Sequence, residues 1–244
     1  MNNAKRALKY LVRIATFPAR YAVRVEYSNA NSHANKDIQS ALQRSALETT
    51  ARYVEEKMSH VSSYSDKFKL FDAILKDTAK VGLWLEFGVY RGETLNYIAS
   101  YAPAVIYGFD SFEGLPEFWR DGFDKGAFGI NEMPEASQKA RLVKGWFDDT
   151  LPEFIANHSG EEISFIHVDC DLYSSTKTIF NLCEDKIKPG TIIVFDEYFN
   201  YPGWQNGEYK AFQEFMVNSD FRYEYIGYVW THEQVAVRIL AKEC

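Results

Sequence analysis

The sequence predicts an α/β protein built on a parallel sheet, followed by a closing pair of strands. From residue 81 onward, short apolar runs alternate with segments of helical periodicity, as in a sheet covered by helices on both faces. Two further strand-like pieces, 222–230 and 233–240, indicate a hairpin around Thr231 and His232. The apolar runs are VGLWLEFG at 81–88, AVIYGFD at 104–110, ARLVKGWF at 140–147, ISFIHVD at 163–169 and GTIIVFDE at 190–197.

Helical patterns fill the segments between these runs and also precede the first of them. Apolar residues recur at three-to-four spacing from 37 to 60, and Ser65 or Asp66 can cap the helix that follows. We expect residues 1–80 to form a helical segment that acts as a lid or an oligomer contact, and residues 81–244 to form the sheet domain. The helices expected within the sheet domain cover 93–101, 150–158, 174–186 and 208–218.

The composition narrows the function classes. The chain has 244 residues, 46% of them hydrophobic and 16% aromatic, and a net charge of −7, whereas a general nucleic-acid binder is usually basic. We therefore expect no nucleic-acid partner. Its three cysteines form no CxxC pair, and there is no signal peptide or bilayer-length apolar run. These features predict a cytoplasmic protein in a reducing compartment.

The first 27 residues are locally basic, with six Lys or Arg residues before the first acid, Glu26. A basic amphipathic helix can lie on an anionic membrane surface, so we expect a peripheral membrane contact as one reading of this segment. The alternative is a helix that joins two subunits or covers a site, with its charged face in water. We expect a homo-oligomer, with a dimer as the simplest form.

The end of the first apolar run predicts a cofactor-binding turn. LEFGVYRGETL places Gly88 and Gly92 in the turn, but the chain has neither the GxGxxG pattern nor a GxxxxGK[ST] loop. Glu86, just before the turn, suits a cationic ligand such as the amino group of S-adenosylmethionine better than a pyrophosphate. Asp110 at the next strand end is placed to bind ribose hydroxyls. The alternatives are an ordinary Gly-bearing turn and a turn-forming Asp before Ser111.

Aromatic residues after the third run can cover an adenine ring. Together these strand ends predict a site for an adenosine-containing cofactor. Its candidate residues are Glu86, Phe87, Gly88, Val89, Tyr90, Gly92, Thr94, Asp110, Ser111, Phe112, Gly145, Trp146, Phe147 and Asp169.

Acidic residues end the fourth and fifth runs. If these strands are neighbours, Asp169 meets Asp196 and Glu197 in one crevice, and such oxygen ligands suit Mg²⁺ or a similar divalent cation. An ion there could hold the hydroxyl oxygens of an acceptor and lower the pKa of the reacting hydroxyl. The alternatives are a helix cap for Asp171 or Ser174 and a solvated loop for the Asp196–Glu197 pair.

A general base has several candidates. Asp169, Asp171 and His232 are the residues that we expect to act in catalysis, while His167 fits a buried core position as well as a base. Two long aromatic loops, 111–137 and 198–212, are expected to cover the site as lids.

In combination, the motifs resemble the macrocin O-methyltransferase family of class I S-adenosylmethionine-dependent methyltransferases. The resemblance spans about 83–198 and implies a Rossmann-like sheet with an antiparallel last strand. It also implies Mg²⁺-dependent methylation of a sugar hydroxyl, with metal ligands at Asp169, Asp196 and Glu197. The Asp-Glu pair at 196–197 differs from the Asp-Asp pair more common in the family. The motifs are LEFGVYRGETL, GFDSFEGLPE, GWFDDTLPEF, HVDCDLYSST and PGTIIVFDEY.

The expected substrate is thus a small molecule or glycoside, such as an antibiotic or polysaccharide precursor. Two other functions stay open at this point. One is methylation of a catechol-like or other small hydroxylated acceptor, and the other is a cofactor-binding scaffold at a membrane assembly.

Overall fold

The computed structural model describes residues 37–242. The basic stretch at 1–27, with its predicted membrane or subunit contact, lies outside the described residues. The chain divides into two compact units, Met1–Ser45 and Ala46–Cys244. The predicted boundary at residue 80 stays a prediction, although β1 (Ser63–Tyr64) and α4 (Lys67–Ile74), which precede it, are elements of the larger unit.

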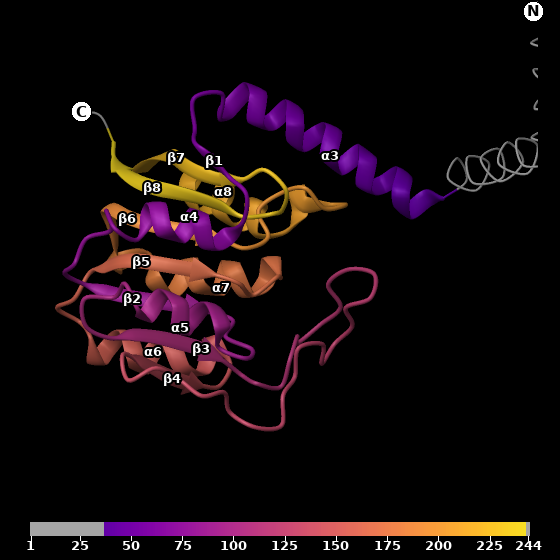
Figure 1. The fold of residues 1–244 in the computed structure, drawn as a ribbon. Helices are drawn as coiled ribbons and strands as arrows, with labels where there is room; N and C mark the ends of the chain where they lie inside the picture. Colours follow the sequence, from indigo (N-terminus) through magenta and orange to yellow (C-terminus); the bar gives the residue numbers. More distant parts are fainter. Residues whose placement is uncertain (1–36, 243–244) are drawn as a thin grey trace, which may run out of the picture. The chain divides into compact units, whose positions relative to one another are not determined.

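The larger unit is built on a mixed sheet whose strand order is β1-β7-β8-β6-β5-β2-β3-β4 (Figure 1). β8 runs antiparallel to both of its neighbours, while the other pairs are parallel, which confirms the predicted parallel sheet with its closing hairpin. The remaining strands are β2 (Leu83–Phe87), β3 (Ile106–Asp110), β4 (Ala140–Lys144), β5 (Ile163–Val168), β6 (Ile187–Phe195), β7 (Phe221–Val229) and β8 (Val235–Ala241).

Helices cover both faces because alternate side chains of each strand point to opposite sides. Leu85 and Phe87 of β2 pack in one apolar cluster with α6 (Phe147–Asn157), α7 (Tyr173–Cys183) and α8 (Glu208–Asn218). Trp84 packs in a second cluster with α4 and α5 (Glu93–Ala99). The sheet is therefore a central layer with a hydrophobic core on each side.

One helix begins with the capping residue that the sequence predicts, whereas two others begin or end away from their predicted positions. Asp66 caps α4 as predicted, since its Oδ1 accepts a hydrogen bond of 3.0 Å from the backbone N–H of Lys69. α6 begins at Phe147, earlier than predicted, and contains Pro152. The predicted helix at 174–186 ends at Cys183 and continues as a short 3₁₀ turn, Glu184–Lys186.

The longest described helix is α3 (Ile38–Lys57), which crosses the boundary between the two units. Its part within the larger unit is anchored by polar contacts: Thr50 Oγ1 accepts a hydrogen bond of 3.0 Å from a backbone N–H of the segment after β6, and Thr49 Oγ1 accepts one of 3.3 Å from Trp204. Across residues 37–242, no helix combines the length and the apolar composition that a bilayer crossing requires.

Candidate active site

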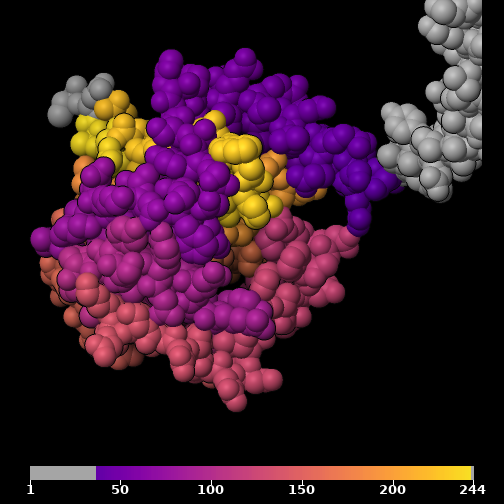
Figure 2. Space-filling model, in the orientation of Figure 1, coloured from indigo at the N-terminus to yellow at the C-terminus, as the bar shows by residue number. Residues whose placement is uncertain are grey.

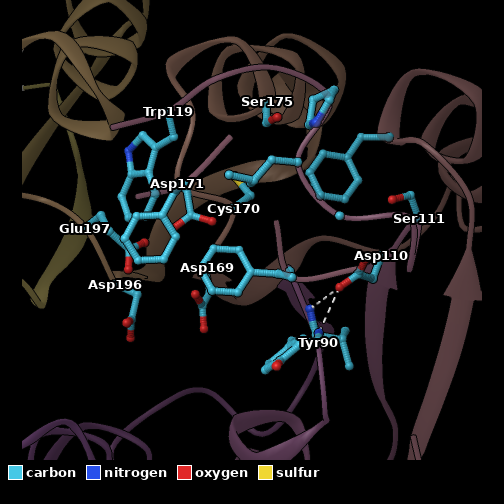
Figure 3. A pocket seen from close by; sticks show the side chains of 18 of the residues that line it. Tyr90, Asp110, Ser111, Trp119, Asp169, Cys170, Asp171, Ser175, Asp196 and Glu197 are labelled. Carbon is cyan, nitrogen blue, oxygen red and sulfur yellow. Dashed lines mark hydrogen bonds between the residues drawn. The ribbon is translucent and has the colours of Figure 1, made fainter. Parts of the chain in front are cut away.

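A cavity of about 780 Å³ opens at the carboxyl edge of the sheet. The ends of β2 to β6 and the long loop after β3 line it, which is where ligands bind in open parallel sheets. In the space-filling view, the surface is hollowed where the magenta, rose and orange parts of the chain meet (Figure 2). The close view shows the acidic side chains of Asp110, Asp169, Asp171, Asp196 and Glu197 around the cavity, together with Tyr90 and Trp119 (Figure 3).

The turn after β2 needs glycine at position 88. Gly88 has a φ of +92°, and a Cβ built there would lie 1.6 Å from the carbonyl oxygen of Asp169. The ends of β2 and β5 approach this closely because Asp169 N–H donates a hydrogen bond of 2.8 Å to Phe87 O. A side chain at position 88 would therefore separate the two strand ends that frame the cavity.

Asp110, at the end of β3, holds the turn in shape. Its Oδ2 accepts hydrogen bonds of 2.8 Å from the backbone N–H groups of Val89 and Tyr90, as Figure 3 shows. Its Oδ1 accepts a third bond, of 2.7 Å, from Phe112 N–H. Tyr90 and Phe112 have φ values of +48° and +59°, a conformation that non-glycine residues seldom adopt and that clusters at binding sites. The ribose contact of Asp110 stays a prediction.

Glu86 is buried beneath the cavity and takes a histidine as its partner. Its Oε1 lies 2.9 Å from Nδ1 of His167, and both side chains are fully buried. The other ring nitrogen of His167 lies 3.5 Å from Oδ1 of Asp196, which is long for a hydrogen bond. Burial lowers the pKa of His167, but Asp196 and Glu86 outweigh it and raise that pKa to about 10. Glu86 therefore acts on the cavity through His167 and Asp196 in this geometry.

The structure brings together the carboxylates of Asp169, Asp196 and Glu197, whose nearest oxygens all lie within 4.8 Å of one another. Burial and the charge of Asp196 raise the pKa of Asp169 well above its usual value, and burial and the charge of Asp171 do the same for Glu197. Burial also opposes ionisation of Asp196, but His167 and Lys67 outweigh it and hold the pKa of its carboxyl below the usual range.

These acids form a donor set that fits a hard divalent cation. All of the ligand atoms are carboxylate oxygens, the type that Mg²⁺ and Ca²⁺ prefer. Within residues 37–242, Glu197 Oε2 is buried and has no hydrogen-bond partner. An unpartnered buried carboxylate oxygen is costly unless a proton or a cation neutralises it. A cation bound there would satisfy that oxygen and relieve the repulsion among the acids.

Three residues around the acids were not predicted from the sequence. Lys67, the first residue of α4, places its Nζ 3.5 Å from Asp196 Oδ1. Gln234 donates a hydrogen bond of 3.0 Å to Asp196 Oδ2, and Glu208 accepts one of 3.2 Å from the backbone N–H of Glu197. The signal for Lys67 was weak, because the sequence marks only the start of its helix and the helix had been placed outside the sheet domain.

Asp171 does not cap α7, and neither does Ser174. The residue at the N-cap position is Leu172, which makes no side-chain capping bond, and Ser174 donates a hydrogen bond of 2.6 Å to Glu117. Asp171 has a φ of +64° and lines the cavity, as Trp119 also does (Figure 3). Burial and the charge of Asp196 raise the pKa of Asp171 to about 7, against the opposing effect of Arg120. The capping alternative was therefore wrong for both residues.

Arg120 joins the two aromatic loops that were predicted to cover the site. Its guanidinium carbon lies 3.8 Å from the ring centre of Trp119, in the loop after β3, and 4.9 Å from that of Tyr201, in the loop after β6. Its Nη1 also lies 3.1 Å from Oε1 of Glu233 in the turn between β7 and β8. One side chain thus connects three segments at the rim of the cavity.

The predicted residues divide into those that line the cavity and those that do not. His232 is one of the latter: it is exposed, and its carbonyl accepts a hydrogen bond of 3.2 Å from the side chain of Asn200. The lining contains Gly88, Val89, Tyr90, Thr94, Asp110, Ser111, Trp146, Phe147, Asp169, Asp171, Asp196 and Glu197. Glu86, Phe87, Gly92, Phe112, Gly145 and His232 are not among the lining residues.

Comparisons with known proteins agree with this geometry. Residues 85–198 match the family model described as a methyltransferase domain. A tetracenomycin-C 4'-O-methyltransferase that acts on a rhamnosyl derivative, from Streptomyces olivaceus, is 27% identical over 142 residues, which are 47% of this chain and 52% of that protein. The demethyldecarbamoylnovobiocin O-methyltransferase of Streptomyces niveus is 23% identical over 154 residues, which are 52% of this chain and 57% of that protein.

The match therefore spans about half the length of these two curated relatives. Among solved structures, a calicheamicin methyltransferase superposes with a TM-score of 0.54 at 23% sequence identity, and the match covers 70% of this chain and 78% of that one. At this level of identity, the likeness shows that the two proteins share a fold.

Proposed function

We propose that the chain, whose residues 85–198 match a methyltransferase-domain family, is a class I S-adenosylmethionine-dependent methyltransferase that methylates a hydroxyl group of a small glycoside. We further propose that a divalent cation, with Mg²⁺ as the natural candidate, takes part. The observation that carries this proposal is the convergence of three carboxylates in the same cavity as the turn held by Asp110.

The cofactor would occupy the part of the cavity between the ends of β2, β3 and β4. Gly88, Val89 and Tyr90 expose their turn to the cavity, and Asp110, which also lines the cavity, fixes that turn. Trp146 and Phe147 also line the cavity, where an aromatic face can cover an adenine ring. S-adenosylmethionine would supply an electrophilic methyl group on its sulfonium sulfur.

The cation would be held by Asp169, Asp196 and Glu197. Bound there, it would act as a Lewis acid that lowers the pKa of a neighbouring acceptor hydroxyl. Gln234 orients the carboxylate of Asp196 and Glu208 fixes the backbone of Glu197, so the Asp196 carboxylate is positioned before any ligand arrives. Preorganisation of this kind reduces the reorganisation that the reaction requires.

Asp171 is the residue that we favour as proton acceptor for the hydroxyl. It lines the cavity beside the acids, whereas His232 is not among the residues that line it. Arg120 and the aromatic rings of Trp119 and Phe123 would enclose the acceptor and exclude water from it. A sugar hydroxyl as the acceptor is supported by the names of the two curated relatives, one of which acts on a rhamnosyl compound.

Calorimetry tests this proposal directly. The wild-type protein, Asp169→Asn and Asp149→Ala are each titrated with S-adenosylmethionine and separately with Mg²⁺. Asp149 also lines the cavity but belongs to α6, so Asp149→Ala removes a pocket carboxylate without removing a cluster acid. We expect wild type and Asp149→Ala to bind Mg²⁺, and Asp169→Asn to lose that binding.

The possible results separate the parts of the proposal. If the wild-type protein binds no S-adenosylmethionine, the methyltransferase function is wrong. If it binds the cofactor but gives no heat with Mg²⁺, methyl transfer proceeds without the cation. The dimer and the small-molecule acceptor stay predictions for gel filtration and for an acceptor screen.

A further inference from the structure

We propose that Lys67 is a built-in cation of the carboxylate cluster, which competes with a divalent ion for Asp196 and stabilises the cluster when no ion is bound. This inference rests on the proposed function, because it concerns the same cluster of Asp169, Asp196 and Glu197. It assigns a role in the site to a residue of α4, which belongs to a segment that the sequence had placed outside the sheet domain.

The backbone around Lys67 is fixed on both sides. After it, the backbone N–H of Lys69 donates the 3.0 Å bond to Asp66 that caps α4. Before it, Tyr64 pairs in parallel with Val229 of β7, and Ser65 O accepts a hydrogen bond of 2.8 Å from the side chain of Thr231. The start of α4 is thus attached to the sheet, and the side chain of Lys67 reaches the cavity from a rigid base.

The ammonium group of Lys67 lies at the acids rather than in solvent. Its Nζ is 3.5 Å from Asp196 Oδ1, and its side chain is 28% exposed. Lysine is ordinarily protonated at neutral pH, so a positive charge lies beside the carboxylate of Asp196. This amine therefore contacts the cluster directly at Asp196, whose nearest neighbours are Asp169 and Glu197.

Asp196 and Glu197 differ in how many protein groups lie next to their carboxylate oxygens. Asp196 has Lys67 and His167 near Oδ1 and Gln234 on Oδ2, so each of its oxygens faces a protein group. Glu197 keeps one buried oxygen without a partner in the described part of the chain. Lys67 therefore neutralises one side of the cluster and leaves the other side to be satisfied by something else.

A divalent ion and Lys67 cannot both occupy their preferred places. An ion such as Mg²⁺ binds a carboxylate oxygen at about 2.0–2.1 Å, so on Asp196 Oδ1 it would lie close to the ammonium group. Two cations at such a distance repel each other strongly in a partly buried site. A bound ion must therefore displace Lys67 from Asp196, and the free energy lost in breaking that ion pair lowers the affinity of the site for the ion.

Titration with Mn²⁺ alone tests this competition. The proteins are wild type, Lys67→Met, Lys67→Arg and the matched control Lys69→Met. Lys69 belongs to the same helix, but it is 64% exposed and pairs with Asp72 at 3.8 Å. We expect Lys67→Met to bind Mn²⁺ about tenfold more tightly than wild type, since a partly buried charge pair is worth more than an exposed one. Lys67→Arg and Lys69→Met should bind like wild type.

A second measurement covers the stabilising half of the inference. In ion-free buffer, Lys67→Met should melt at a lower temperature than Lys69→Met, and Mn²⁺ should raise its Tm by more than it raises the Tm of the control. If Lys67→Met does not fold in ion-free buffer, Lys67→Gln, which keeps a polar group, replaces it in both measurements.

Equal or weaker Mn²⁺ binding by Lys67→Met would overturn the inference, as would the absence of Mn²⁺ binding in all four proteins. Titration of the same samples with S-adenosylmethionine separates this failure from that of the proposed function. If the cofactor binds while Lys67→Met leaves the Mn²⁺ affinity unchanged, only the role of Lys67 is wrong. If the cofactor does not bind to wild type, the proposed function itself fails.

Discussion

Replacing Gly88 by alanine should disrupt the framework of the site more than the same change at another glycine of similar conformation. Gly88 and Gly190 have φ values of +92° and +101°, so alanine is strained at both positions. Their surroundings differ. A Cβ at position 88 would lie 1.6 Å from the carbonyl oxygen of Asp169, whereas a Cβ at position 190 has no atom within 4 Å.

The expected losses of unfolding free energy follow from backbone strain at positive φ and from steric overlap of the added Cβ. A non-glycine residue at positive φ costs about 1–2 kcal/mol, which applies to both variants. Overlap with a neighbour that cannot move away costs about 1–3 kcal/mol more, and it applies only to Gly88→Ala. The obstructing atom at position 88 belongs to the backbone, held by the 2.8 Å bond between Asp169 N–H and Phe87 O, so it cannot rotate away.

Urea unfolding followed by tryptophan fluorescence measures the difference. We expect Gly88→Ala to lose about 2–5 kcal/mol of unfolding free energy and Gly190→Ala about 1–2 kcal/mol. Gly88→Ala should also lose affinity for S-adenosylmethionine, because the turn that faces the cavity moves. Equal losses of stability in the two variants would refute the argument, since they would mean that β2 and β5 do not approach each other at this point.

Three further predictions concern other parts of the site. Asp110→Asn should lower the unfolding free energy by about 1–3 kcal/mol and weaken S-adenosylmethionine binding, because the backbone N–H groups of Val89, Tyr90 and Phe112 donate to the carboxylate. Urea unfolding and calorimetry measure the two effects, and unchanged values would contradict the prediction. Arg120→Ala should speed limited proteolysis within 111–139, since Arg120 connects that loop to Glu233; a cleavage rate equal to that of wild type would show that the pair does not restrain the loop. Burial raises the pKa of the Cys183 thiol to about 12, so at pH 8 iodoacetamide should modify Cys183 only after the protein unfolds in urea. Mass spectrometry detects the modification, and rapid modification of the folded protein would contradict the burial of this thiol.

Strand periodicity explains why the sequence alone could locate the acids. The apolar runs mark β5 and β6 without ambiguity, and an acid follows each run, at Asp169 and at Asp196. Once parallel strands are neighbours, their carboxyl ends meet at one edge, so the convergence of these residues follows from the topology. The same reasoning placed Asp110 at the end of the next strand, as the candidate partner for ribose hydroxyls.

The partners of those residues depend on register and on chain segments far away in the sequence. Glu86 lies opposite His167 in the pairing of β2 with β5, and His167 lies opposite Val194 in the pairing of β5 with β6. These registers place the His167 ring between Glu86 and Asp196. A one-residue shift would turn the side chains to the other face of the sheet, so no local pattern could reveal that Glu86 would be buried with a histidine.

Tertiary structure also decided the roles of Lys67 and Asp171. Lys67 reaches the acids because β1 pairs with β7 and sets the start of α4 against the sheet, 129 residues away from Asp196 in the sequence. Asp171 enters the cavity because its backbone is left-handed, a conformation that its sequence context permits but does not require. The sequence by itself determined which strands end in acids and hence the class of chemistry, because strand patterns are local. Only the folded chain decided which charges face each other, because electrostatic partners are set by long-range packing.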